Sequence, residues 1–439
     1  MTCRVLIAAK HNDGLFRAVF NAHSRLGSAN EIDVLTCKGS AAEYCNVSGI
    51  STLYVCEALS AGLRQLGMEY NSVIVVAAAD ECGDLQLSSG VLTIIQAPEL
   101  EFTDVHKVPD SPRILRVEAT NRCSARCRMC PNRFVFRSHG HRELSPEGLE
   151  WDFLSSVKDI VFLQNGEFTE ALYLREWLRV TSDVRARLHV TTNGSHLTPN
   201  LLNELVEAGL SSITFSIDST DPVVFRDIRY GSCLERVLEG LDGALGLPCR
   251  ARQGRPIVQV NITLQRRNVR SLTSTCKDLA ARGVDAIHIE YARIYPENVE
   301  AGDMEPLDSL YFDQELADAC IREAMVSVQG FACELSVPPP FEQQSAERRD
   351  QPVTAYCWQP LTDVVVWGNG DVTPCVGAQS FILGNIHTAP LHDIWHGTTA
   401  EVFRSRLLSG DTPDECKECI CGGRWNGRAF EKDWHLSDL

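Results

Sequence analysis

The chain lacks any long hydrophobic run, and aromatic residues make up only 7% of its 439 residues. The longest apolar stretch, residues 73–79, is far too short to cross a bilayer and suits a buried strand. At the N-terminus, apolar residues 5–9 give way at once to Lys10, so this segment predicts a strand rather than a signal peptide. We therefore expect a cytoplasmic protein with no membrane partner.

Basic residues are also scarce relative to acidic ones. The chain has 41 Lys and Arg against 58 Asp and Glu, which gives a net charge of −17. A chain this acidic repels a phosphate backbone, so we expect no extended nucleic-acid binding.

Cysteine, in contrast, is abundant, with 18 residues. In a cytoplasmic chain these do not predict disulfides. Three of them, Cys123, Cys127 and Cys130, form a CxxxCxxC pattern directly after an apparent strand. A loop this short can point three thiolates at one metal centre, and three ligands leave one coordination position open for chemistry. The alternatives are a zinc loop or three unrelated cysteines, although this spacing without a nearby fourth ligand is unusual for zinc.

Proline-rich stretches at 97–113 and 336–352 divide the chain into three parts. We predict an N-terminal α/β domain at 1–108, a central domain at 109–335 and a small cysteine-rich domain at 336–439. In the central domain, strands alternate with helices, which predicts a parallel sheet with helices outside. Six such units are too few for a closed eightfold barrel, so we expect a partial (β/α)6 TIM-like barrel with chemistry at the C-terminal strand ends. The candidate strands are 113–118, 160–164, 187–192, 211–217, 257–264 and 286–291.

The cysteine loop, placed after the first of these strands, resembles the cluster loop of radical S-adenosylmethionine (radical SAM) enzymes. The resemblance implies that Cys123, Cys127 and Cys130 hold three irons of a 4Fe-4S cluster, while the fourth iron binds S-adenosylmethionine (SAM). It further implies reductive cleavage of SAM to a 5′-deoxyadenosyl radical, with the protein orienting the substrate.

Other strand ends carry residues similar to the cofactor motifs of that family. The segment 164–168, Gln-Asn-Gly-Glu-Phe, resembles the family's Gly-Gly-Glu-Pro, with matches at Gly166 and Glu167 and departures at Asn165 and Phe168. The segment 191–194, Thr-Thr-Asn-Gly, is similar to the family's Thr-Asn-Gly. The cofactor-binding residues that the resemblance implies are Gly166, Glu167, Thr192, Asn193, Ser216, Asp218, Arg229 and Asn261.

A second group of cysteines lies in the third part. An Asn369-Gly370 pair between two apolar segments predicts a hairpin that carries Cys375 back toward Cys357. The arrangement resembles the SPASM/twitch domains that follow some radical SAM barrels, and it implies one auxiliary 4Fe-4S cluster that acts in electron transfer. A structural zinc site is the alternative. The implied ligands are Cys357, Cys375, Cys416 and Cys419, with Cys421 as a substitute for Cys419.

The first part resembles the N-terminal domain of electron-transfer flavoprotein α subunits through segments 5–14, 20–27, 31–35 and 47–50. The flavin-binding region of that family has no counterpart in this sequence. The resemblance therefore implies an α/β fold alone.

Taken together, the resemblances imply a radical SAM oxidoreductase. We favour a small sugar-like or aminocyclitol alcohol as substrate, oxidised through the auxiliary cluster, with flavodoxin or ferredoxin as electron donor. A peptide maturase that crosslinks, oxidises or epimerises a ribosomal peptide is the second hypothesis, and a zinc scaffold or electron-transfer adaptor the third. The candidate catalytic residues, at the end of the sixth strand and directly after it, are Glu290, Tyr291 and Arg293.

Overall fold

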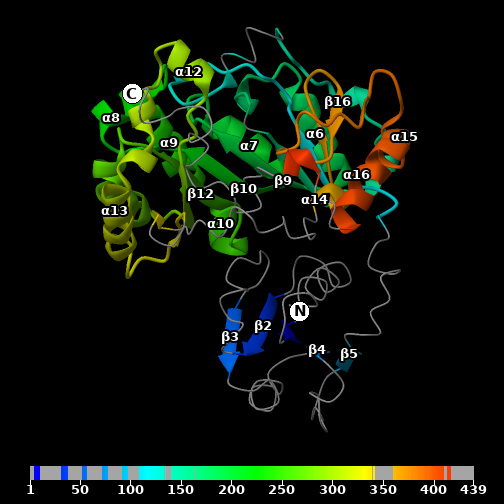
Figure 1. Ribbon diagram of the computed structural model, residues 1–439. Coiled ribbons are helices and arrows are strands. Elements are labelled where there is room, and N and C mark those ends of the chain that lie inside the picture. The colour runs from blue at the N-terminus through cyan, green and yellow to red at the C-terminus, as the bar shows by residue number, and fades with distance from the viewer. Residues whose placement is uncertain are drawn as a thin grey trace. The chain divides into compact units, whose positions relative to one another are not determined.

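The computed structural model divides the chain into two compact units, Met1–Lys107 and Val108–Leu439 (Figure 1). In the first unit it describes the backbone of five strands. In the second it describes residues 108–132, 134, 140–163, 165–338, 340–341, 359–409 and 413–416.

The first unit contains a parallel five-stranded sheet in the order β3-β2-β1-β4-β5. Parallel neighbours require crossover connections. The chain starts in the middle of this sheet and builds outward on both sides, as in doubly wound α/β folds. The apolar stretch 73–79 lies largely on β4, as predicted. The strands are β1 (Arg4–Ala9), β2 (Glu31–Cys37), β3 (Thr52–Cys56), β4 (Ser72–Ala77) and β5 (Val91–Gln96).

The second unit contains all six strands predicted for the central domain; three have the predicted ends, and the ends of the other three are shifted by one or two residues. Neighbouring strands are parallel throughout this series. Their C-terminal ends therefore share one edge of the sheet. The strands are β6 (Ile114–Val117), β8 (Asp159–Phe162), β9 (Arg187–Thr192), β10 (Leu210–Ser216), β12 (Ile257–Leu264) and β13 (Ala286–Tyr291).

Further strands extend this sheet at both edges. β14 (Glu334–Ser336) adds in parallel to β13, and β15 (Asp363–Val366) adds in parallel to β6. β15 also forms the predicted hairpin with β16 (Asp371–Thr373), and β16 pairs with β17 (Gly384–Asn385). In the described residues the sheet runs from β14 to β17 without closing. The cysteine-rich third part thus continues the central sheet beside its first strand, which the sequence did not predict.

Helices follow most strands, and their ends obey local rules. The Thr198 hydroxyl accepts a hydrogen bond from Leu201 N at 3.2 Å and caps α7, while Gly283 ends α11 with a φ of 91°. The longer helices are α6 (Leu174–Val184), α7 (Pro199–Glu207), α9 (Leu234–Leu245), α11 (Leu272–Arg282), α13 (Gln314–Ser327) and α16 (Thr398–Ser409). The shorter ones are α8 (Pro222–Ile228), α10 (Pro248–Gln253), α12 (Pro296–Glu300), α14 (Gln359–Thr362) and α15 (Leu391–Trp395). Among the described helices, none combines the length and apolarity needed to span a bilayer.

Side chains alternate along the central strands. On β12, Val258, Val260 and Ile262 are fully buried, and helices α9 and α11 pack against β12 and β13. The residues between them, Gln259 and Asn261, are polar and only half-buried. β9 and β10 alternate in the same way. The sheet therefore has an apolar face under the helices and a polar face opposite, which we call the open face.

Candidate active site

The cysteines of the CxxxCxxC motif lie in the loop that follows β6. Cys127 belongs to a two-residue strand, β7 (Arg126–Cys127), which pairs antiparallel with β11 (Arg229–Tyr230). The backbone N–H of Cys130 donates to the carbonyl of Cys127 at 3.1 Å. The loop is thus folded back on itself and tied to the segment after β10.

The three thiols lie close enough together to influence one another. Burial, together with the neighbouring thiols, raises the pKa of Cys123 to about 12, and burial together with Cys130 raises that of Cys127 to about 11 although Arg229 opposes the shift. Metal binding must therefore displace their protons. Within the described residues, no three His, Cys, Asp or Glu side chains converge as the ligands of a single metal ion would. Three thiolates bound to separate irons do not need to converge on one point, so this absence does not weigh against a cluster.

Charged residues that the sequence analysis missed brace this loop. Arg128 Nη2 lies 2.8 Å from Asp227 Oδ1, and Arg267 Nη1 lies 3.0 Å from the other oxygen of Asp227. Arg267 in turn pairs with Asp308 at 2.9 Å. The loop is therefore joined to the segments that follow β10, β12 and β13.

Asn298 on α12 holds the loop from another direction. Its side chain is fully buried, and its amide donates to the carbonyl of Arg128 and, at 3.4 Å, to that of Cys130. Neither Asn298 nor the pairs around Asp227 carries a local sequence signal, because their partners lie far away along the chain.

Gly166 presses against the backbone of the cysteine loop. A Cβ at this position would come within 2.8 Å of the carbonyl oxygen of Arg122 and still closer to that of Thr120. The next residue, Glu167, donates its N–H to the same Arg122 carbonyl at 2.7 Å. Only glycine permits this approach, so the backbone of the turn after β8 is in direct contact with the backbone of the cysteine loop.

The Glu167 carboxylate is buried at the centre of a polar cluster. It accepts hydrogen bonds from the Thr192 hydroxyl at 2.7 Å and from the Asn193 N–H at 2.6 Å. Burial raises its pKa, although these hydrogen bonds oppose the shift. The Asn193 amide lies 3.6 Å from the sulfur of Cys123. Four predicted site residues are thus in mutual contact.

Asp218 and Arg229 form a buried ion pair beside Cys127. Arg229 Nε lies 2.7 Å from Asp218 Oδ2, and Arg229 Nη1 donates to the sulfur of Cys127 at 3.7 Å. The second Asp218 oxygen accepts the N–H of Thr263 at 2.8 Å. Hydrogen bonds to cysteine sulfurs tune the potential of a bound cluster.

Ser216 and Asn261 lie side by side on the open face. Ser216 is the register partner of Asn261, which is the partner of His288 on β13. Two residues further on, Thr263 lies opposite Glu290, whose side chain is exposed. These residues place a polar row near the C-terminal ends of β10, β12 and β13.

The three candidate catalytic residues do not lie together. Tyr291 is 5% exposed, on the opposite face of β13 from Glu290, and packs on Phe341 with ring centroids 4.7 Å apart. Arg293 is exposed and lies over the ring of Tyr295 at 5.0 Å. Burial raises the pKa of Tyr295, and Cys130 adds to that shift, so this segment lies beside the cysteine loop.

The structure brings two of the second group of cysteines together. Cys375 and Cys416 are buried in one small cluster with Ala378 and Phe403. Cys357, Cys419 and Cys421 lie outside the described residues.

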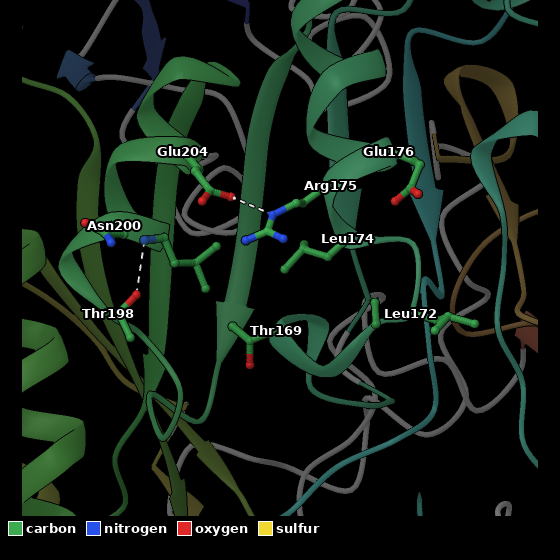
Figure 2. A pocket seen from close by; sticks show the side chains of 10 residues that line it. Thr169, Leu172, Leu174, Arg175, Glu176, Thr198, Asn200 and Glu204 are labelled. Atoms are coloured by element: carbon green, nitrogen blue, oxygen red, sulfur yellow. Dashed lines mark hydrogen bonds and ion pairs between the residues drawn. The ribbon is translucent and has the colours of Figure 1, made fainter.

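A hollow of about 580 Å³ lies at the starts of α6 and α7 (Figure 2). Arg175 and Glu204 lie on its wall with 3.5 Å between Nε and Oε2. None of the predicted site residues lines this hollow, and we assign it no part in the chemistry.

Comparison with known proteins identifies the families that these segments match. Residues 117–264 match the profile of the radical SAM superfamily, and residues 357–420 match that of the SPASM iron-sulfur cluster-binding domain. The AdoMet-dependent heme synthase of Methanosarcina barkeri is 24% identical over 332 residues, which cover 72% of this chain and 91% of that protein. A probable GTP 3′,8-cyclase of Sulfolobus acidocaldarius is 28% identical over 40% of this chain and 54% of its own.

Among solved structures, Streptococcus suis SuiB resembles the chain with a TM-score of 0.52 at 13% identity over 72% of each chain. SuiB bound to its precursor peptide SuiA gives a TM-score of 0.50 at 13% identity over 83% of each. At this identity the likeness concerns the fold.

These matches also bear on the hypotheses drawn from the sequence. The iron-sulfur domain profile spans Cys357, Cys375, Cys416 and Cys419, which supports auxiliary iron-sulfur clusters rather than the zinc scaffold. Both profiles lie outside residues 1–107, so the resemblance to electron-transfer flavoprotein gains no support from them. The two profiles show that the protein binds SAM, a 4Fe-4S cluster of the radical SAM type and auxiliary iron-sulfur clusters. This chain is a member of the radical SAM superfamily and carries a C-terminal SPASM iron-sulfur domain.

Proposed function

We propose that the chain oxidises a small, polar, hydroxyl-bearing molecule, with hydrogen abstraction at a carbon that carries the hydroxyl. The observation that carries this proposal is the open face of the sheet, whose half-buried side chains on β9, β10 and β12 are all polar apart from Ile257 at the start of β12. Donors and acceptors fixed on rigid strands can orient a substrate rich in hydroxyl or amino groups.

Several of these polar groups already hold one another in place. His189 Nδ1 lies 2.8 Å from the Ser212 hydroxyl, and His189 Nε2 lies 2.8 Å from Asp159 Oδ1. Thr214 donates to Gln259 at 3.3 Å. In contrast, the Glu290 side chain is exposed, opposite Thr263 in the register of β12 and β13. It is therefore accessible to a ligand. We assign Glu290 as the base that takes the hydroxyl proton.

The residues that would hold the first cluster are Cys123, Cys127 and Cys130. When bound, that cluster and SAM supply a 5′-deoxyadenosyl radical. Around them, we assign Gly166, Glu167, Thr192 and Asn193 to the methionine end of SAM, because they surround the loop on one side. Ser216, Asp218, Arg229 and Asn261 are assigned to its remaining polar groups.

The second site would take up the electron that oxidation of the substrate releases. Loss of a hydrogen atom and then of a proton and an electron converts an alcohol to a carbonyl. Cys375 and Cys416 lie together in a buried setting suited to a closed, electron-accepting cluster. We propose that Cys357 and Cys419 complete one auxiliary 4Fe-4S cluster, and that Arg293 orients the substrate beside the loop.

A peptide substrate is the second candidate. The likeness in fold to SuiB favours it, since SuiB has been crystallised with a precursor peptide. The first unit argues against a leader-peptide grip of the winged-helix kind, because its described strands form an all-parallel sheet.

The test is deuterium transfer. Reconstituted enzyme is incubated anaerobically with SAM, dithionite and a panel of polyols and aminocyclitols deuterated at the carbinol carbons. The proposal predicts deuterium in 5′-deoxyadenosine and a carbonyl product with one panel member. Transfer only from a deuterated peptide encoded near the gene would support the second candidate and contradict the first.

A further inference from the structure

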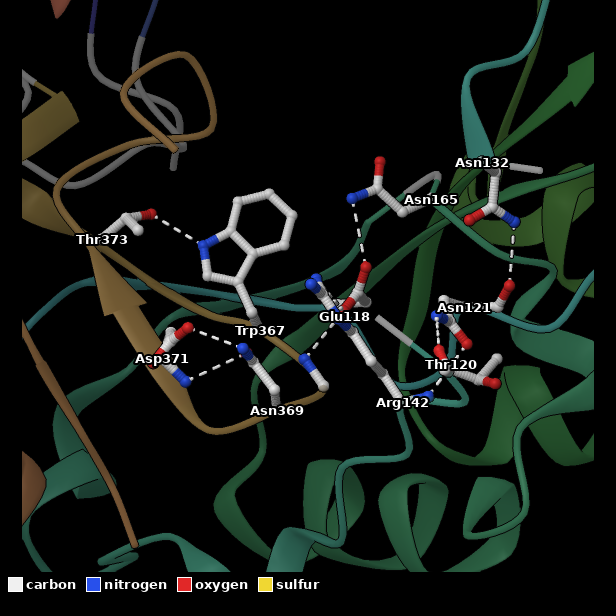
Figure 3. A network of polar contacts seen from close by, with 12 residues as sticks. Glu118, Thr120, Asn121, Asn132, Arg142, Asn165, Trp367, Asn369, Asp371 and Thr373 are labelled. Carbon is white, nitrogen blue, oxygen red and sulfur yellow. Dashed lines mark hydrogen bonds and ion pairs between the residues drawn. The ribbon is translucent and has the colours of Figure 1, made fainter. Parts of the chain in front are cut away.

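Glu118 is a buried carboxylate that no step of the proposed mechanism uses. It directly follows β6, and its side chain is completely inaccessible to solvent. A charged group in such a place is costly unless several partners hold it. Its partners come from two different parts of the molecule (Figure 3).

The first partner belongs to the cofactor turn, residues 165–167. Asn165 Nδ2 donates to Glu118 Oε1 at 3.1 Å. Asn165 occupies the position at which the family's motif has glycine. Because Gly166 and Glu167 are pressed on the backbone of residues 120–122, a shift of Asn165 would move the whole turn relative to the cysteine loop.

The second partner belongs to the SPASM domain. The backbone N–H of Gly368, directly after Trp367, donates to Glu118 Oε2 at 2.9 Å, and Arg142 Nη1 lies 3.7 Å from the same oxygen. A Cβ at Gly368 would come within 2.7 Å of the Cβ of Arg142 and within 2.9 Å of that oxygen. The two oxygens of one carboxylate thus contact two different domains.

From Gly368 the contacts continue toward an auxiliary cysteine. The indole of Trp367 donates to the Thr373 hydroxyl at 2.9 Å, and that hydroxyl donates to the carbonyl of Cys375 at 3.1 Å. An unbroken series of contacts therefore runs from the cofactor turn through Glu118 to Cys375.

We propose that Glu118 is a positioning residue that couples the SAM-binding turn to the SPASM hairpin. A role in stability alone does not require a hydrogen-bonding group at this point, since apolar residues of similar volume serve a core at least as well. A carboxylate instead offers two acceptor oxygens in one plane, and here each takes a donor from a different domain. The inference rests on SAM binding by the superfamily and not on the proposed substrate.

The test exchanges the carboxylate of Glu118 and the amide of Asn165 between the two positions. Asn165→Asp places a second carboxylate against Glu118 and removes the donor, so SAM affinity should fall by about tenfold to a hundredfold. Glu118→Gln should have a small effect, because the new amide can still accept from Gly368 and the Asn165 amide can turn over. The double variant restores a donor–acceptor pair and should return affinity to within about threefold of wild type.

A third variant tests the other half of the coupling. Gly368→Ala, in the SPASM hairpin, crowds the Glu118 carboxylate and should weaken SAM binding by about tenfold. The matched control is Asp363→Asn. It weakens the 2.7 Å ion pair that joins Asp363 on β15 to Arg116 on β6, and it leaves the contacts of Glu118 unchanged. It should keep wild-type SAM affinity.

SAM affinity is measured by anaerobic calorimetry on reconstituted holoenzyme without substrate, and the unfolding midpoint is recorded for every variant. Rescue in the double variant together with weak binding by Gly368→Ala supports the coupling. A double variant as weak as Asn165→Asp, wild-type affinity in Gly368→Ala, or equal loss in Asp363→Asn would overturn it. Because no substrate is present, the result is independent of the proposed function.

Discussion

The guanidinium of Arg229 lies 3.7 Å from the sulfur of Cys127 and, through Nε, 2.7 Å from the carboxylate of Asp218. Both charged side chains are less than a tenth exposed. Burial opposes the charge on Arg229, but Asp218 and Cys127 together raise its pKa. The pair therefore places a fixed positive charge against a cluster ligand.

Removing one member of this pair leaves the other charge buried and uncompensated. We predict that Asp218→Asn lowers the free energy of unfolding by about 3 kcal/mol. The control is Asp242→Asn, which breaks a more exposed pair with Arg282 and should cost less than about 1 kcal/mol. Urea unfolding of the cluster-free protein measures both. Equal losses in the two variants would contradict the account.

Glu290→Gln tests the assigned base. The variant keeps the size of the side chain but cannot take a proton, so turnover should fall by about a hundredfold or more. SAM cleavage without substrate should continue at the wild-type rate. Glu297→Gln, at an exposed position on α12, serves as the control. Normal turnover in Glu290→Gln would remove Glu290 from the mechanism.

Tyr291→Phe separates the catalytic candidates. Among the described residues the buried Tyr291 hydroxyl has no hydrogen-bond partner, and burial raises its pKa. Loss of an unsatisfied buried hydroxyl is close to neutral or stabilising. We therefore expect unchanged turnover and an unfolding midpoint at or above that of wild type. A loss of turnover with normal stability would return Tyr291 to the active site.

Asp159 gives a prediction for pH. Burial favours its neutral form, but hydrogen bonds from His189 and Arg187, at 2.8 Å and 2.7 Å, lower its pKa overall. A depressed folded-state pKa contributes stability above the unfolded value of about 3.9, and this is lost as pH falls through the folded value. Asp159→Asn should therefore be less stable than wild type at pH 7, with a difference that shrinks below about pH 4. A difference independent of pH would show that the charge of Asp159 is not involved.

The sequence predicted those parts of the structure that short segments determine. The six strands from β6 to β13 and the hairpin at Asn369-Gly370 follow from patterns a few residues long. Gly166 was found because the order of strands placed it after β8.

Contacts between distant segments were missed. The parallel pairing of β15 with β6 joins two segments that are separated in the chain by the whole series of strands from β8 to β14, and nothing in residues 363–366 identifies the partner strand. Asn298 and Asp227 hold the cysteine loop from later segments, and neither belongs to a motif. Glu118 lay inside a predicted strand, where its charge could have drawn attention, but its partner Gly368 donates through the backbone.

The most direct measurement is an iron and sulfide count on anaerobically reconstituted wild type and on the Cys375→Ser variant, with 5′-deoxyadenosine assayed in each. The account predicts about eight irons in wild type and about four in the variant, with SAM cleavage retained in both and turnover lost in the variant. About four irons in wild type, zinc in place of iron, or loss of SAM cleavage in Cys375→Ser would contradict two separate clusters with the assigned ligands.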